Sequence, residues 1–176
     1  CAVHKSCSLV ELYAHVMGME PLSAAILLMR ELGLSIDAEA RGHVVDHLLE
    51  RAKQDTAKGD VEEALDLIEV AHSAAPGDPR PLVRKADLLE RLGDSADAVS
   101  GYIAAAHLFG KAKDFDEAID VLKNEALRLA PGHKMALQEL MNIYKTRNPG
   151  ESDWVDTLLQ LAELLIADED YTTAQK

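Results

Sequence analysis

Residues 59–78 decide the fold, because they read GDVEEALDLIEVAHSAAPGD and describe one amphipathic helix between two turns. Asp60 stands where a helix N-cap is favoured, and Glu63 follows at the spacing of a capping box. Apolar residues then recur every three or four positions, which is the period of a helix with one buried face. Ala64 is small enough to let a neighbouring helix approach closely, and Pro76 followed by glycine ends the helix.

The same pattern returns further along the chain. Residues 114–132 read DFDEAIDVLKNEALRLAPG and contain the capping pair Asp114 and Glu117. Residues 93–105 hold a more divergent copy, and residues 170–174 begin another. Self-similarity of this kind predicts an array of helical units that bury their apolar faces against one another.

Composition supports an all-α fold. Alanine and leucine, which are strong helix formers, are abundant, whereas the chain of 176 residues has only two Phe, one Trp and four Tyr. The periodic segments predict helices near residues 8–18, 21–33, 38–58, 60–75, 79–92, 95–112, 114–130, 133–147 and 151–167. A further helix is expected to start in the tail after Asp168, so that the array continues or is capped further on.

These residues together resemble tetratricopeptide repeats over residues 45–176. Residues 45–78 and 79–112 look like two such units, and Ala64 and Ala98 stand thirty-four residues apart, one period of the family. The resemblance implies antiparallel helix pairs that stack into a right-handed solenoid with a concave binding groove. It also implies a protein or peptide partner bound in that groove.

The register departs from the family after Ala98. The next alanine of the pattern, Ala118, follows after only twenty residues, so one long helix near residues 95–112 must serve two units. A longer period of about 55 residues, which fits three helices per unit, relates Asp60, Asp114 and Asp170.

Residues 1–37 form a separate N-terminal segment ahead of the array of residues 38–176. Cys1, His4 and Cys7 are a compact group of zinc-ligand types, and Cys-x-x-His has metal-ligand spacing. Zinc at a structural site takes four ligands, whereas this group offers three. Because the chain begins at Cys1 without Met, we expect a fragment or a processed form.

The N-terminal segment also resembles the second half of the zinc ribbon of bacterial DNA primases. Cys1 and His4 would be the third and fourth zinc ligands, followed by Val10-Glu11-Leu12-Tyr13, Met19-Glu20-Pro21-Leu22-Ser23 and Leu32-Gly33-Leu34. The resemblance implies a bacterial protein with a ribbon that contacts nucleic acid. Two alternatives stay open: a helical hairpin that caps the array, and an acylated Cys1 of a lipoprotein.

Charge and motifs narrow the function. A net charge of −13 argues against nucleic-acid binding by the whole chain, because phosphate binding needs clustered Lys and Arg. No apolar run is long enough to span a membrane, and no signal region is present, so a cytoplasmic protein is expected. No phosphate loop, nucleophile elbow or zinc-protease helix occurs, which predicts a non-catalytic protein. His43 and His47 share a helix face, where a surface or packing role is expected.

Groove residues follow from the resemblance to tetratricopeptide units. The family's groove positions fall on Lys53, Arg80, Arg84, Asp87 and Arg91. Arg80 and Arg84 are four residues apart on one helix face, so both could hold a carboxylate or phosphate of the partner. The alternative is that these arginines are solvated or pair with neighbouring acids.

The sequence therefore predicts an interaction scaffold that binds a peptide or protein and needs no cofactor. The alternative is a DNA-associated protein in which the N-terminal segment binds zinc and nucleic acid while the repeats recruit a partner. An apolar solenoid end would also permit self-association.

Overall fold

The computed structural model describes residues 24–27, 31, 38–147 and 152–174. All regular structure in these residues is helical, which confirms the predicted all-α fold class. Two compact units, residues 1–81 and 82–176, are described separately below. The right-handed course of the whole solenoid and the division after residue 37 stay predictions. Of the predicted N-terminal hairpin, only residues 24–27 and 31 are described, and they are helical.

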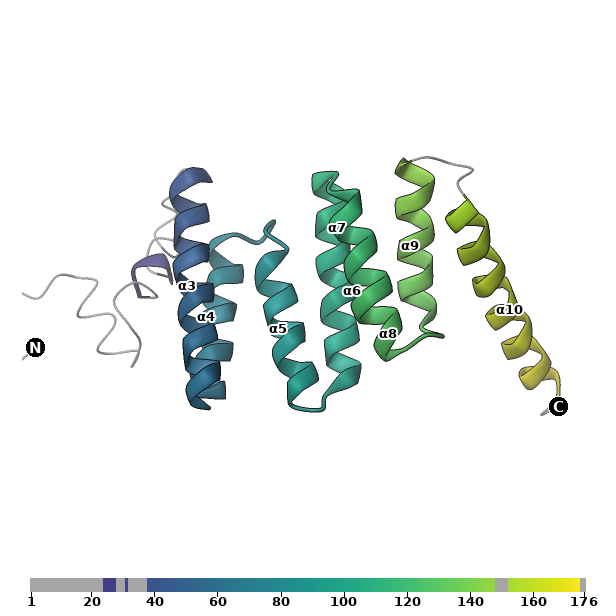
Figure 1. Cartoon of the computed structure of the whole chain (residues 1–176), viewed down its shortest axis with the longest axis horizontal. Coiled ribbons are helices and arrows are strands. Elements are labelled where there is room, and N and C mark those ends of the chain that lie inside the picture. The colour runs from purple at the N-terminus through teal and green to yellow at the C-terminus, as the bar shows by residue number, and fades with distance from the viewer. Residues whose placement is uncertain (1–23, 28–30, 32–37, 148–151, 175–176) are drawn as a thin grey trace, which may run out of the picture. The chain divides into compact units, whose positions relative to one another are not determined.

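The first unit contains an antiparallel hairpin of α3 (Ala38–Lys58) and α4 (Val61–Ala74), drawn in blue in Figure 1. Small and branched apolar residues are buried where the two helices meet: Val45, Leu48 and Ala52 from α3, and Ala64, Ile68 and Ala71 from α4. Ala64 and Ala71 are fully buried and lie seven residues apart, which places them on one face two turns apart. The small alanine predicted at a helix contact is therefore confirmed.

The second unit contains most of α5 and all later helices (Figure 1). Its elements are α5 (Arg80–Arg91), α6 (Ser95–Ala112), α7 (Phe115–Asp120), the π-helical segment η1 (Val121–Ala126), α8 (Leu127–Leu129), α9 (Lys134–Arg147) and α10 (Ser152–Ala174). The segments α7, η1 and α8 follow one another without a break and act as a single helix. One apolar cluster runs through the unit and includes Val99, Tyr102, Leu122 and Leu140.

One turn geometry occurs three times among the residues that the structure describes. Before α4, the N–H of Asp60 donates to the carbonyl oxygen of Asp55 at 2.9 Å, and Gly59 between them has a φ of 96°. The same bond runs from Asp94 to Leu89 at 2.9 Å and from Asp114 to Phe109 at 3.0 Å. This six-residue closure satisfies carbonyl groups at a helix end and requires a left-handed residue. The repeated unit of the sequence is therefore also a repeated unit of backbone structure.

The predicted capping boxes are wrong in one respect. Asp60 and Asp114 do occupy N-cap positions, but neither side chain accepts a capping hydrogen bond. Their ψ angles of 70° and 66° differ from the extended backbone of an ordinary N-cap, because the turn just described fixes these residues. Of the three aspartates at these turns, Asp94 does accept such a bond, from the N–H of Asp97 at 3.4 Å. The acidic residues still lie where the helix dipole favours negative charge.

Helix α6 belongs to two helix pairs, as the sequence predicts. On one side it meets α5, where a Cβ built on Gly101 would lie only 3.0 Å from the Cβ of Ala86. On another side it packs against α7 and η1, and Ala105 and Ala106 are fully buried. A glycine at the closest approach to α5 and alanines elsewhere allow one helix to have neighbours on several faces.

The π-helix η1 corresponds to one extra residue. The paired alanines of the repeat are seven residues apart in α4 (Ala64 and Ala71) but eight apart here (Ala118 and Ala126). All four alanines are fully buried. A π-helical turn takes up one residue more than an α-helical turn, so Ala126 stays on the buried face.

A second turn geometry recurs after the π-helix with the predicted period of about 55 residues. The N–H of Asp78 donates to the carbonyl of Ala75 at 2.9 Å, and that of His133 donates to the carbonyl of Ala130 at 3.0 Å. Ala75 and Ala130 have nearly the same backbone angles, with φ of −139° and ψ of 77° and 81°. The three-helix period predicted from the sequence is thus present in the backbone.

Helix α10 differs from its prediction. A break near Asp168 and a new helix after it were expected, but α10 continues from Ser152 to Ala174. At the three turns described above, the residue before the aspartate is Gly59, Gly93 or Lys113, each with a positive φ. Residue 169 is a glutamate, and the helix continues through it.

Candidate partner-binding site

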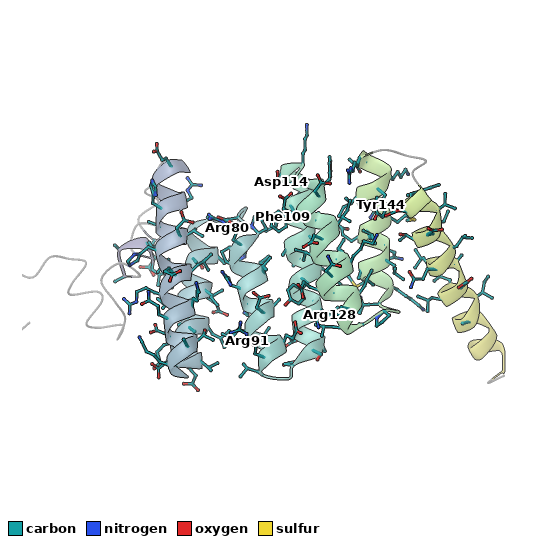
Figure 2. The ribbon with its side chains drawn as sticks, in the orientation of Figure 1. Arg80, Arg91, Phe109, Asp114, Arg128 and Tyr144 are labelled. Carbon is teal, nitrogen blue, oxygen red and sulfur yellow. The ribbon has the colours of Figure 1, made fainter. Side chains whose placement is uncertain are left out.

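Helix α5 carries most of the predicted groove residues on one face. Arg80, Arg84, Asp87 and Arg91 follow at spacings of four, three and four residues, which keeps them on the same side of the helix. Figure 2 shows Arg80 and Arg91 at the two ends of α5. Pro81 lies in the first turn, where its missing N–H costs the helix nothing. The carboxylate of Asp78 accepts the N–H of Arg80 at 3.0 Å and so caps this helix.

Arg80 is held by two acids of the first unit. Its Nε donates to Asp78 Oδ1 at 3.0 Å and its Nη2 to Asp78 Oδ2 at 2.6 Å, while its Nη1 reaches Asp46. Burial would raise the pKa of Asp78, but the hydrogen bonds and charge of Arg80 outweigh it and lower that pKa. The hydrogen bond with Asp78 in turn raises the pKa of Arg80. Most donors of this guanidinium are therefore already used inside the protein.

Arg84 and Arg91 are less committed. Arg84 Nη1 lies 3.8 Å from Asp87 Oδ2, and half of its side chain is exposed. Arg91 is exposed and forms no ion pair with any residue that the structure describes. Lys53, in the first unit, is exposed and lies 3.8 Å from Glu50. Exposed ion pairs of such length contribute little stability, so Arg84 and Lys53 can exchange their partners for a ligand.

Asp87 is fixed by a tyrosine rather than being free for a ligand. The hydroxyl of Tyr102 lies 2.8 Å from Asp87 Oδ1 and 3.1 Å from Glu90 Oε2, so its single proton is donated to one carboxylate at a time. Burial and these two carboxylates raise the pKa of Tyr102. Arg128 Nη2 then bonds Glu90 at 2.7 and 2.9 Å, which lowers the pKa of Glu90. This network ties α5 to α6 and α8.

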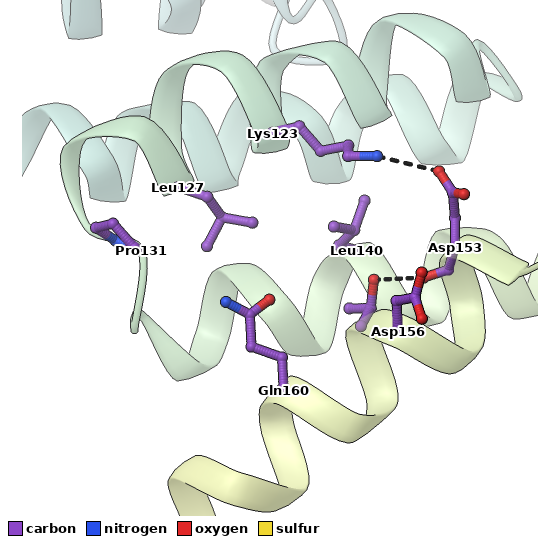
Figure 3. A pocket seen from close by; sticks show the side chains of 8 residues that line it. Lys123, Leu127, Pro131, Leu140, Asp153, Asp156 and Gln160 are labelled. Carbon is purple, nitrogen blue, oxygen red and sulfur yellow. Dashed lines mark hydrogen bonds and ion pairs between the residues drawn. The ribbon is translucent and has the colours of Figure 1, made fainter.

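A pocket in the second unit was not foreseen from the sequence (Figure 3). It has a volume of about 350 Å³ and lies between the η1–α8 segment, α9 and α10. Its apolar side is formed by Leu127, Pro131 and Leu140, and its polar side by Lys123, Asp153, Asp156, Thr157 and Gln160. No sequence motif indicates it, because its residues come from segments that are joined only by folding.

The wide π-helical turn supplies the cation of this pocket. Lys123 Nζ donates to Asp153 Oδ2 at 3.1 Å and lies 3.4 Å from the hydroxyl of Tyr144, which itself donates to Asp153 Oδ2 at 3.2 Å. The hydrogen bond with Asp153 raises the pKa of Lys123, and burial raises that of Tyr144. With Lys123 engaged, the carboxylate of Asp156 and the amide of Gln160 remain to meet a cationic or polar group.

Metal chemistry finds no support in the described part of the chain. His43 and His47 are exposed on α3, as expected for surface residues, and no cluster of three metal-ligand side chains occurs among the described residues. Cys1, His4 and Cys7 lie outside the described residues, so the zinc prediction stays a prediction. No helix in the described part of the chain is long and apolar enough to cross a membrane.

The fold and these sites define an all-α protein that is built from repeated helical hairpins. No protein-family model matches the chain, and no curated protein matches it. A solved structure titled "Crystal structure of MamA" is similar, with a TM-score of 0.33 and 12% identity over 96% of this chain and 99% of that chain. Membership of the tetratricopeptide family stays a prediction.

Proposed function

We propose that this protein is a non-catalytic interaction scaffold and that the arginine face of α5 grips an acidic segment of a protein partner. The observation that supports this is the pair Arg84 and Arg91, seven residues apart on one exposed face of a chain with a net charge of −13. Arginine forks hold carboxylates with two parallel hydrogen bonds, which gives both affinity and orientation.

Neighbouring contacts favour this use of α5. Arg80 and Asp87 are immobilised by Asp78 and Tyr102, so the helix that carries the exposed arginines is held at several points. A rigid support reduces the entropy that binding would otherwise cost. The predicted joint grip by Arg80 and Arg84 therefore becomes, in our proposal, a grip by Arg84 and Arg91.

A peptide selection tests this proposal. Random peptides displayed on phage are selected on the full chain, and the affinity of the winners is measured for wild type, for the double variant Arg84→Gln/Arg91→Gln, and for Lys111→Gln. Lys111 is an exposed cation on α6 and serves as the matched control. We expect acidic peptides whose affinity falls about tenfold or more in the double variant and is unchanged in the control. Equal affinity for all three proteins would refute the assignment of α5.

The nucleic-acid alternative remains tied to residues 1–37. Elemental analysis of the full-length protein, including any residues that precede Cys1, distinguishes it, because a primase-like ribbon requires about one zinc per chain that is lost in a Cys1→Ser/His4→Ala variant.

A further inference from the structure

Helix α10 presents a continuous apolar stripe to solvent. Five large apolar residues on it are between 38% and 61% exposed: Val155, Leu158, Leu159, Leu165 and Ile166. Their spacings of three, one, six and one residues place all five on one face of the helix, together with Ala162. The stripe therefore has the pattern of a helix face that packs against another helix.

A different face of α10 is the one packed within the second unit. Thr157 and Leu161 are buried, and Trp154 belongs to the apolar cluster. Figure 1 shows α9 beside α10, and α9 is its main helical neighbour among the described elements. Elsewhere in the described part of the chain, the exposed large apolar residues are two isolated ones, Leu92 and Met135. Isolated residues are ordinary, whereas five on one face mark an interaction surface.

Charge along the stripe indicates what kind of partner fits. Asp156 and Glu163 are exposed, lie seven residues apart along one edge of the stripe, and pair with no residue that the structure describes. Between residues 152 and 174 the sequence contains no Lys or Arg. The nearby cation Lys123 is already bonded to Asp153. The edge is therefore negative and uncompensated.

We propose that the stripe of α10 binds an amphipathic basic helix of a partner protein. Its apolar residues, at three- and four-residue spacings, would pack on the stripe, and its Lys or Arg residues would lie along the edge formed by Asp156 and Glu163. A second copy of this chain fits less well, because pairing α10 with α10 would set acidic helices side by side without a cation on either. This surface is separate from the arginine face of α5 and attracts the opposite charge.

The pocket described above adds a place for one basic side chain. Asp156 borders both the pocket and the stripe, and the aliphatic stem of a Lys or Arg would cover Leu127 and Leu140 while its charge stays near Asp156. A basic residue at one position of the partner helix would then contribute more than the others.

A designed peptide tests the proposal on the full chain. The probe is a synthetic amphipathic helix with leucines on one face and lysines on the other, and its companion has glutamates in place of the lysines. Titration calorimetry measures the affinity of each for wild type and for three double variants. These are Leu159→Gln/Ile166→Gln on the stripe, Asp156→Asn/Glu163→Gln on its edge, and Glu62→Gln/Glu63→Gln on α4 as the matched control for lost charge.

We expect the lysine peptide to bind and the glutamate peptide not to bind. The stripe variant should lose about tenfold or more in affinity, the edge variant several-fold at low salt, and the control nothing. Circular dichroism checks that the exposed substitutions leave the helices intact. Equal loss in edge and control variants would mean attraction by net charge alone, and it would overturn the proposal, as would unchanged binding by the stripe variant.

Sedimentation of the protein without peptide supplies the other decisive result. A monomer agrees with the proposal. A dimer that the Leu159→Gln/Ile166→Gln change converts to a monomer would show that a second copy covers the stripe, and the basic-helix proposal would then be wrong.

Discussion

Helix α4 and the continuous helix α7–η1–α8 begin and end with the same two turn geometries, and each buries a pair of alanines at equivalent positions. They nevertheless differ in length by one residue. In α4 seven residues separate the alanines and the helix is regular, whereas eight separate them in the second helix and a π-helical segment forms. Both solutions keep both alanines fully buried. Burial of the alanine face is thus kept in both helices, whereas the hydrogen-bond pattern changes from α-helical to π-helical.

Removing one exposed residue from each helix should give the largest difference in stability between the two. Deleting Asp66 in α4 rotates everything after it by about 100°, which turns Ala71 out of its buried position. Deleting Asn124 from η1 should instead restore regular α-helix with seven-residue spacing. We expect the first deletion to lower the free energy of unfolding by more than about 3 kcal/mol and the second by about 1 kcal/mol.

Urea unfolding followed by circular dichroism measures both deletions. If they prove equally destabilising, the extra residue is not what the π-helix accommodates, and the correspondence between the two helices fails. Deletion of Asn124 should also shift Lys123 away from Asp153. A change in the affinity of the lysine peptide described above, measured by titration calorimetry, would report this shift.

The turns that precede the two helices offer a smaller contrast. Gly59 before α4 and Lys113 before α7 both adopt a left-handed backbone, with φ of 96° and 70°. Only glycine adopts it without a steric cost, so Gly59→Ala should destabilise by about 1 kcal/mol and Lys113→Gly should stabilise by about 0.5 kcal/mol. Thermal unfolding of the two variants gives both values.

Gly77 provides the control for that pair. It also has open space around it but lacks a positive φ, so Gly77→Ala should change stability by less than about 0.5 kcal/mol. Destabilisation of the same size at Gly77 and Gly59 would argue against backbone conformation as the cause.

The smallest expected effect concerns the end of the second helix. Arg128 in α8 bonds Glu90 and Glu125, and its hydrogen bonds lower the pKa of Glu90. A lowered pKa means that this stabilisation is present above the ordinary pKa of a glutamate and is lost as the pH falls through the lowered value. We expect wild type to lose stability more steeply than Glu90→Gln between about pH 5 and pH 3. Parallel pH profiles would show that the pair contributes nothing.

Most of the fold could be predicted because its signals are local. The bounds predicted for α3 and α6 from helix periodicity, Gly-Asp turns and Pro-Gly stops are the observed ones. The bounds of the other described helices were predicted within a residue or two, apart from the end of α10. The capping bonds of Asp60 and Asp114 were mispredicted, although Asp94, with nearly the same backbone angles, does form such a bond. The end of α10 was mispredicted because the absence of a left-handed residue is not visible in residue type alone.

The sites were harder to predict because they depend on contacts between distant segments. The spacing of Arg80, Arg84 and Arg91 could be seen in the sequence. The acids that pair with Arg80, above all Asp46, are brought to it only by folding. Asp153 pairs with Lys123 across thirty residues of sequence. The stripe on α10 was readable as periodicity, but its exposure was not, since the same pattern describes a buried face.

Helix α6 has a consequence for cooperativity. It meets α5 through Gly101 and Tyr102 and α7–η1 through its other faces, so neither neighbour can detach without exposing part of the same helix. Repeat arrays in which each unit has its own helices can melt unit by unit from an end. A helix shared between two pairs joins their melting into one transition, and residues 82–147 should therefore exchange their protected amide hydrogens as a single block.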